Sequence, residues 1–262
     1  MSLDHPTSDG VHRLYINADD FGLHPDINAG IARCARAGRL SGFSISANGS
    51  AVDWDLAREL QELGMKVGLH LTLVGEPWLS QTKTITKWPA LVPMLALPST
   101  RRAIENEAAA QIQIIQKNKL RVDHIDSHQH VHVIEPIWTI VHNLARQFRI
   151  DRIRVPWAPT PLLAKPTVAG RVLQLISASR RDDRSLPCIG LKFAGHNTIK
   201  ILEDELRQAK RDVELVAHPG DQTDALSTHY AAWKFDWKSE TEMLMSDDFE
   251  RVLDRCGYLL GR

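Results

Sequence analysis

The chain has 262 residues, of which 43% are apolar and 24% charged, and this ordinary globular composition fits one large α/β barrel better than two small domains. Its 32 basic and 32 acidic residues balance, and no Lys- or Arg-rich block stands out, so we do not expect nucleic acid as the main partner. Three widely spaced cysteines without a CxxC pair and an amino-terminal segment without an apolar core predict a cytoplasmic protein with reduced thiols.

In chain order, the predicted elements alternate between strand and helix. The predicted strands cover 13–18, 42–47, 66–74, 122–127, 152–156, 189–193, 213–218 and 258–261. The predicted helices cover 24–38, 53–64, 99–118, 135–148, 167–179, 198–211 and 240–256. This uninterrupted βα series predicts a parallel sheet, open or closed into a barrel, in a single domain over 1–262 with a flexible segment at 1–12.

Two long segments break the alternation, at 75–98 and 219–238, and segments of this kind often cover a site. The first contains the most apolar stretch of the chain, WPALVPMLALP at 88–98. Its short length and three prolines argue against a membrane span, so stable insertion into a membrane is not expected.

The stretch HIDSHQHVHV at 124–133 contains four histidines and an aspartate, all at even positions. In a continuous strand these side chains would share one face, and His128 and His132 would lie about 13 Å apart at about 3.3 Å per residue. One metal ion with ligand bonds near ~2 Å can therefore take one of these histidines, or two if the chain bends. The remaining ligands must come from elsewhere in the sequence.

Ionisable residues recur where the predicted strands end. They are Asp19 and Asp20, His70, Asp126 and His128, Arg154, and His218. Any one of them could be an ordinary hydrogen-bonding group at a strand end. The carboxyl ends of parallel strands meet at one rim, however, and barrel enzymes build their active sites there. Their convergence favours a functional site that includes part of the His-rich stretch.

Two imidazoles and a carboxylate can form a three-ligand metal site with open positions for water and substrate. Such an ion polarises a carbonyl and lowers the pKa of a bound water, while a second carboxylate can take the water proton and a histidine can protonate the leaving group. These residue types therefore predict hydrolysis. The sequence lacks the GxSxG, HExxH and glycine-rich phosphate-binding motifs of other hydrolytic or nucleotide-binding proteins.

Five motifs in this order resemble those of the YdjC-like carbohydrate deacetylases: YINADDFG, VGLHLTLV, VDHIDSHQHVH, RIRVPW and ELVAHPG. They span residues 14–220, so the resemblance covers nearly the whole chain. It implies a distorted TIM-like (β/α) barrel, related to that of the NodB-type polysaccharide deacetylases. The implied reaction removes an N-acetyl group from an amino sugar and releases acetate, with one divalent ion that is magnesium or zinc. The resemblance also implies a homodimer.

The resemblance assigns roles to individual residues. Asp20, His70 and His128 match the metal ligands, Asp19 the general base, His218 the general acid, and Arg154, more loosely, the arginine that orients the base. The segment DQTD that follows HPG departs from the pattern, because an aromatic residue is expected there.

Four further residues near these motifs have less certain roles. Asp126 could orient a ligand histidine, as carboxylates near metal sites do. We expect His130 near the site, whereas strand geometry puts His132 too far along for anything but a structural role. Trp157 could stack on a sugar ring at the rim, although packing is the commoner role of a single tryptophan.

Two other functions fit the same residues. A metal-dependent phosphoesterase on a similar barrel would hold two or three ions and would favour several basic residues at the rim, where Arg154 is the one found. A non-catalytic sugar-binding protein would have lost a ligand, whereas every matched position is intact.

Overall fold

The structure is a computed structural model that describes residues 11–158, 168–182 and 185–262. The strands are β1 (His12–Phe21), β2 (Gly42–Ile45), β3 (Lys66–Leu71), β4 (His124–Ser127), β5 (Arg152–Ile153), β6 (Cys188–Ile189), β7 (Val213–Ala217) and β8 (Tyr258–Leu260). The helices are α1 (Pro25–Arg36), α2 (Trp54–Glu62), α3 (Trp88–Leu91), α4 (Pro98–Lys117), α5 (Ile137–Phe148), α6 (Val168–Arg180), α7 (Ile199–Ala209), α8 (Asp224–His229), α9 (Trp237–Met245) and α10 (Asp247–Cys256). Three 3₁₀ segments complete the set: η1 (Val92–Ala96), η2 (His128–Val133) and η3 (Leu191–Phe193).

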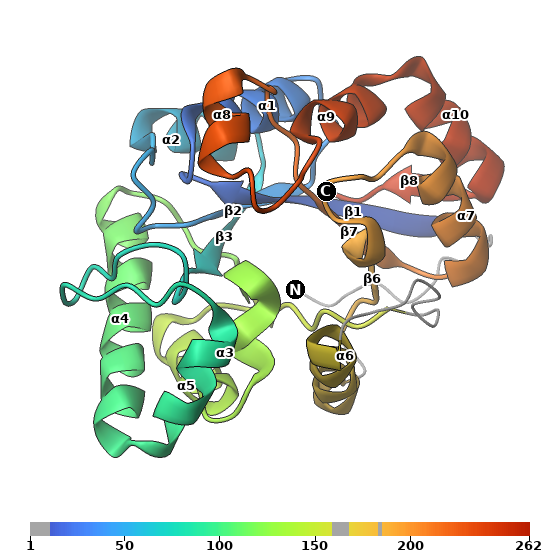
Figure 1. Cartoon of the computed structure of the whole chain (residues 1–262). Helices are drawn as coiled ribbons and strands as arrows, with labels where there is room; N and C mark the ends of the chain where they lie inside the picture. The colour runs from blue at the N-terminus through green and yellow to red at the C-terminus, as the bar shows by residue number, and fades with distance from the viewer. Residues whose placement is uncertain (1–10, 159–167, 183–184) are drawn as a thin grey trace.

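All strands pair in parallel, in the order β5-β4-β3-β2-β1-β7-β6, and β8 pairs with the start of β1. Helices cover the outside of this curled sheet (Figure 1). The strands at the two ends, β5 and β6, do not pair with each other in the described part of the chain. The predicted α/β barrel is therefore confirmed in a distorted, open form.

Side chains and irregular backbone join the two ends of the sheet. Glu214 on β7 accepts a hydrogen bond from Nε of Arg154, which follows β5, at 2.7 Å, and it also pairs with Arg152 of β5. The N–H of Cys188 at the start of β6 donates to the carbonyl of Trp157 at 2.7 Å. These contacts take the place of a β5–β6 ladder.

The helices bury the faces that their spacing predicts. Ile104, Ala108, Ile112 and Ile115 of α4 are all buried in the core. Helix α1 begins after His24, whose side chain accepts from the N–H of Asp26, and Pro25 occupies a position where no intrahelical N–H is needed. Apolar spacing and local caps therefore suffice to place these helices against the sheet.

The sequence was less informative where the backbone changes direction. The predicted helix over 240–256 is two helices, α9 and α10, because Ser246 between them is extended with ψ 151°. In place of the predicted strand over 189–193, β6 covers only Cys188 and Ile189 and ends before Gly190, which takes a left-handed conformation with φ 83°. The long segments at 75–98 and 219–238 contain the short helices α3 and α8.

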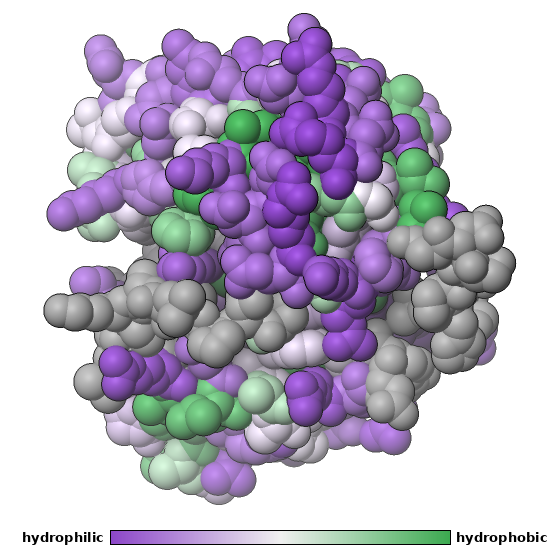
Figure 2. All heavy atoms as spheres, turned by 90° about the vertical axis from the view of Figure 1, so that its right-hand side faces the viewer, coloured by the Kyte–Doolittle hydropathy of each residue, from purple (hydrophilic) through white to green (hydrophobic). Residues whose placement is uncertain are grey.

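Among the helices in the described residues, none combines the length and the apolar character that a membrane crossing requires. Figure 2 shows the face on which α7, α10 and β8 lie, and hydrophilic side chains cover most of its coloured part, with smaller apolar patches between them. Surface ion pairs on this face include Glu203 with Arg207 and Arg255.

Removing Glu214 tests whether its ion pairs hold the ends of the sheet together. Glu214→Ala leaves the fully buried Arg154 without one of its compensating charges, and breaking a buried pair in this way costs roughly 3 to 5 kcal/mol. We expect a loss of that size in the free energy of unfolding measured with urea. Glu203→Ala, which removes two surface ion pairs, is the control and should lose much less. Equal losses in the two variants would contradict the assignment.

The same ion pair predicts a dependence of stability on pH. Burial would raise the pKa of Glu214, but Arg152 and Arg154 lower it from 4.5 to about 2. A depressed pKa in the folded state stabilises the protein above the unfolded value and loses that contribution as pH falls through the folded value. The difference in unfolding free energy between the native chain and Glu214→Gln should therefore shrink between about pH 5 and pH 2. A constant difference over that range would argue against an ionised Glu214.

Candidate metal and active site

Asp19 and Asp20 lie together near the end of β1, although neighbours in a regular strand point to opposite faces. The pairing of β1 with β2 shifts register between Ala18 and Phe21, and Asp20 has a left-handed backbone with φ 71°. A non-glycine residue in this conformation is strained, and such strain clusters at functional sites. The irregular backbone lets both carboxylates approach His70: Asp19 Oδ2 lies 3.9 Å from Nδ1, and Asp20 Oδ1 lies 3.1 Å from Nε2.

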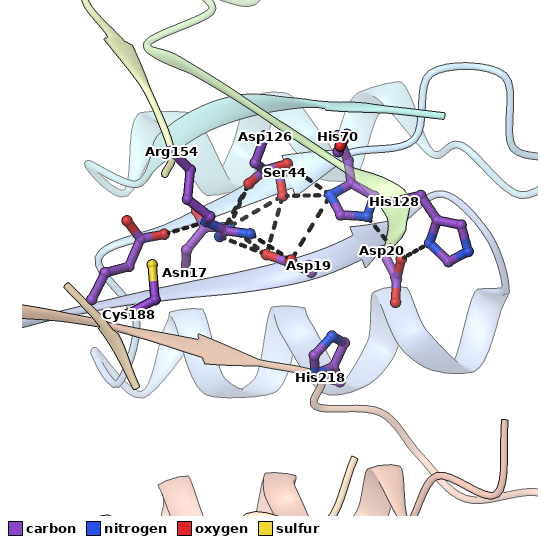
Figure 3. A network of polar contacts seen from close by, with 12 residues as sticks. Asn17, Asp19, Asp20, Ser44, His70, Asp126, His128, Arg154, Cys188 and His218 are labelled. Carbon is purple, nitrogen blue, oxygen red and sulfur yellow. Dashed lines mark hydrogen bonds and ion pairs between the residues drawn. The ribbon is translucent and has the colours of Figure 1, made fainter. Parts of the chain in front are cut away.

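Asp20, His70 and His128 form one buried cluster (Figure 3). Asp20 Oδ1 lies 3.1 Å from His70 Nε2 and 3.2 Å from His128 Nδ1. Burial alone would raise the pKa of Asp20, but hydrogen bonds from His128 and His70 hold it well below its usual value. The structure therefore brings together the three residues that the motifs marked as metal ligands.

The His-rich stretch does not continue as a straight strand, because the chain bends where β4 ends. His128 begins a 3₁₀ segment, and Gln129 and His130 are left-handed with φ 55° and 54°. The chain thus leaves the strand direction directly after Ser127. One histidine of the stretch, His128, joins the Asp20 cluster.

Asp126 has the position expected of a carboxylate that orients His70. Its Oδ1 lies 2.7 Å from His70 Nδ1, so that nitrogen donates to Asp126 and Nε2 points toward Asp20. Burial would lower the pKa of His70, but Asp126, with Asp20 and Asp19, raises it to about 10. Burial would likewise raise the pKa of Asp126, but Arg154 and His70 hold it well below its usual value.

Arg154 lies in the interior behind these residues and is 1% exposed. Its guanidinium contacts both oxygens of Asp19 at 2.6 and 2.8 Å, Asp126 Oδ2 at 3.0 Å and Glu214 Oε1 at 2.7 Å. Burial would lower the pKa of Arg154, but Asp126, Asp19 and Glu214 raise it well above the usual value. The two hydrogen bonds from Arg154 therefore fix the orientation of the Asp19 carboxylate.

Sequence reasoning missed Asn17 and Ser44, which complete the surroundings of Asp19. Asn17 Nδ2 donates to Asp19 Oδ1 at 2.9 Å, and the Ser44 hydroxyl lies 3.4 Å from the same oxygen. Asn17 stands in the NADDFG motif and could have been noticed as a polar residue inside a buried strand. Ser44 gives no such signal.

His218 follows β7 and lies on the opposite side of Asp20 from His70 (Figure 3). Its imidazole is largely buried and faces the edge of the Phe235 ring, with the two ring centroids 5.0 Å apart. Its main-chain N–H donates to Glu240 Oε2 at 2.6 Å. Phe235 and Glu240 thus hold His218, and the sequence pattern did not predict these two contacts.

His130 and His132 differ in their contacts. His132 is fully buried, and its ring bridges the Ser127 hydroxyl at 2.5 Å and the Arg154 carbonyl at 2.7 Å. Burial lowers the pKa of His132 to about 4, so a neutral ring donates from Nε2 and accepts at Nδ1. His130 is half-buried. Burial and the charges of Arg154 and His132 hold the pKa of His130 well below its usual value.

Trp157 does not lie where a sugar-stacking residue at the rim was expected. Its ring packs against the guanidinium groups of Arg181 and Arg211, at 5.2 and 6.0 Å from the ring centroid. Arg211 precedes β7, so Trp157 lies toward the amino ends of the strands, whereas the site is at their carboxyl ends. The chain after Arg154 turns toward β6, where the Trp157 carbonyl meets Cys188, and this backbone path carries the ring away from the rim.

Aromatic residues near the site come instead from the segment 219–238. The Trp233 ring stacks on His128, with centroids 5.0 Å apart and planes at 29°, and Tyr230 and Phe235 pack against Trp233. For Glu76 of the other long segment, burial raises the pKa, and the nearby charges of His229 and His128 oppose the shift. The aromatic residue missing directly after HPG is thus replaced by a cluster further along the chain.

Comparison with known proteins agrees with the motifs. The family model described as YdjC-like protein matches residues 13–255. A chitooligosaccharide deacetylase of Proteus mirabilis is 28% identical and aligns with 96% of this chain and 97% of its own length. A carbohydrate deacetylase of Oceanobacillus iheyensis is 26% identical and aligns with 89% of this chain and 96% of its own.

The fold has a match among crystal structures as well. A structure from Enterococcus faecalis, proposed to be that of a cellobiose-phosphate cleavage protein, superposes with a TM-score of 0.72 at 19% identity. The superposition covers 96% of this chain and 97% of that one, so the two share their fold over nearly their full length. Since the family model, the motifs and the full-length relatives agree, the chain belongs to the YdjC-like family.

Proposed function

We propose that this protein is a metal-dependent hydrolase that removes the N-acetyl group of an amino sugar and releases acetate. One observation carries the proposal: the buried Asp20–His70–His128 cluster lies beside the Asp19 carboxylate, which Arg154 fixes, and the imidazole of His218 follows the neighbouring strand β7 (Figure 3). The deacetylase names of two relatives aligned over most of the chain support the same reaction.

The donor set of the cluster fits a divalent ion. Ligand bonds near 2 Å to one ion place neighbouring donor atoms roughly 3 to 3.5 Å apart, and Asp20 Oδ1 is 3.1 and 3.2 Å from the two imidazole nitrogens. Asp126 holds His70 in the way that carboxylates orient metal-ligating histidines. Asp20, His70 and His128 would hold the ion, which when bound polarises a carbonyl and favours deprotonation of water.

Asp19 would act as the general base through Oδ2. Its other oxygen, Oδ1, already accepts from Arg154 and Asn17. Oδ2 accepts one hydrogen bond from Arg154, which leaves a lone pair of this oxygen for a proton from the attacking water. The guanidinium thus orients the base without occupying all of its acceptor sites.

His218 would supply the other proton. As the carbon–nitrogen bond breaks, the electron pair stays on nitrogen, and the amine takes a proton from the imidazolium of His218. The oxygen of the attacking water becomes part of acetate. Asp19 near the end of β1 and His218 after the neighbouring strand β7 come from different strands, and these separate positions support the division of roles (Figure 3).

The phosphoesterase alternative has less support. A second group of possible ligands, Asp19, His70 and Asp126, shares His70 with the first. Arg154 contacts both carboxylates of this second group, and its fixed positive charge disfavours a further cation there. These contacts favour one ion per chain, as in the deacetylase reading.

Acetate release tests the reaction. We expect the purified protein to release acetate from N-acetylglucosamine compounds such as chitobiose, to stop when a chelator is added, and to recover with added zinc or magnesium. A coupled enzymatic assay measures the acetate. The panel of substrates also includes a lipid-linked glycoside. If no compound releases acetate while the protein carries metal, the deacetylase proposal fails. Two or three ions per chain, together with phosphate release from sugar phosphates, would favour the phosphoesterase.

Two neighbouring substitutions separate the proposed ligand from the proposed base. Asp20→Ala should lose metal and activity together, because it removes a ligand. Asp19→Asn should keep about one ion per chain but lose about 10²- to 10⁴-fold in kcat, the usual contribution of general acid–base catalysis. Elemental analysis and acetate release give the two readouts, and thermal unfolding checks that both variants fold. Full activity in Asp19→Asn would remove Asp19 as the base.

A further inference from the structure

Glu240 is a fully buried carboxylate on α9, and the proposed reaction does not yet use it. Its Oε2 accepts the main-chain N–H of His218 at 2.6 Å, and its Oε1 accepts the N–H and side-chain amide of Asn197 at 3.2 and 2.8 Å. Every contact is thus a donor to Glu240, so both of its oxygens act as acceptors. A carboxylate offers acceptors to all three of these donors, whereas a carboxamide would turn its own N–H₂ toward one of them.

A buried carboxylate is costly unless a positive charge compensates it. In the described part of the chain, no Lys or Arg lies within ion-pair distance of Glu240, and the ionisable group that does is the imidazole of His218. His218 Nδ1 lies 3.9 Å from Glu240 Oε2, and this buried nitrogen has no hydrogen-bond partner. Charge and geometry therefore couple the two side chains.

Contacts from α9 and α1 hold the backbone around His218. Thr241, the neighbour of Glu240, accepts from the N–H of Gly220 and donates to its carbonyl, both at 2.9 Å. A Cβ atom on Gly30 of α1 would come within 2.3 Å of Gly220 Cα, which shows how closely the backbones pack there. The HPG segment is fixed between α1 and α9, and Phe235 packs against the His218 ring.

We propose that Glu240 is a positioning residue that makes His218 the proton donor of the reaction. It directs Nδ1 toward itself, leaves Nε2 for the departing amine, and stabilises the imidazolium that gives up the Nε2 proton. Glu240 acts through His218 and does not contact the substrate. The inference rests on the proposed deacetylation, in which the amine nitrogen keeps the electron pair of the broken bond and needs this proton.

Glu240 could instead have a purely structural role and only anchor the HPG segment. Substrates with different leaving groups distinguish this role from the positioning of a proton donor. An amine cannot leave without a proton, whereas 4-nitrophenolate leaves as a stable anion. Loss of a proton donor should therefore slow hydrolysis of an N-acetyl sugar and spare that of 4-nitrophenyl acetate. Loss of anchoring should slow both.

The experiment compares kcat on these two substrates for the native protein, Glu240→Gln, Glu240→Asp and Glu242→Gln. Glu242 is exposed on the same helix and pairs with Lys238, so Glu242→Gln is the matched control and should keep native activity. We expect Glu240→Gln to lose about 10²-fold or more on the amide, a typical general-acid contribution, while retaining its rate on the ester. Glu240→Asp, which keeps the charge, should recover part of the amide activity.

Equal losses on both substrates, or no loss on the amide, would overturn the proposal. A second readout needs no turnover: ¹⁵N NMR of the histidine rings, with His218 assigned from a His218→Gln variant. The neutral ring should carry its proton on Nδ1 in the native protein and lose that preference in Glu240→Gln, and an unchanged Nδ1 proton would refute the coupling. If the native protein deacetylates no amino sugar, the proposed function fails, and the NMR result still decides the role of Glu240.

Discussion

The buried charge of Arg154 is the constraint on which the rest of the site depends. A guanidinium in a protein interior costs several kcal/mol unless carboxylates compensate it, and here Asp19, Asp126 and Glu214 do so together. Each of these carboxylates has a second contact: Asp126 holds His70, Asp19 accepts from Asn17, and Glu214 pairs with Arg152. One cation thereby connects the two ends of the open sheet with the orientation of the proposed base and of a proposed metal ligand.

Around this fixed charge, the residues that face the site lie where regular structure is interrupted. Asp20 adopts a left-handed backbone at a register shift of β1, and the chain turns through left-handed Gln129 and His130 directly after His128. Regular strands would send Asp19 and Asp20 to opposite faces and would carry His128 onward along β4. The local strain therefore lets neighbouring residues converge, and the buried hydrogen bonds around them stabilise it.

The two sides of the site are built differently. On the His70 side, carboxylates and Arg154 form a dense network in which each of Asp19, Asp126 and Glu214 contacts the guanidinium. On the His218 side, the ring faces an aromatic residue and a single carboxylate, Glu240, with a free nitrogen between them. On the His70 side, charges that compensate one another suit metal ligands and a base. On the His218 side, a single imidazole–carboxylate pair suits a group that gains and loses a proton during the reaction.

The sequence by itself determined the alternating order of strands and helices and the strand ends that carry Asp19, Asp20, His70, Asp126, His128, Arg154 and His218, because apolar periodicity is local and the carboxyl ends of parallel strands share one edge. It did not determine which side chains support them. Glu214 meets Arg154 across 60 positions and Glu240 meets His218 across 22, and Trp157, expected at the rim, turns toward β6. Only the tertiary structure decided these contacts. They depend on the curvature of the sheet and on the points where the backbone leaves regular strand geometry, and no pattern among neighbouring residues in the sequence reports either feature.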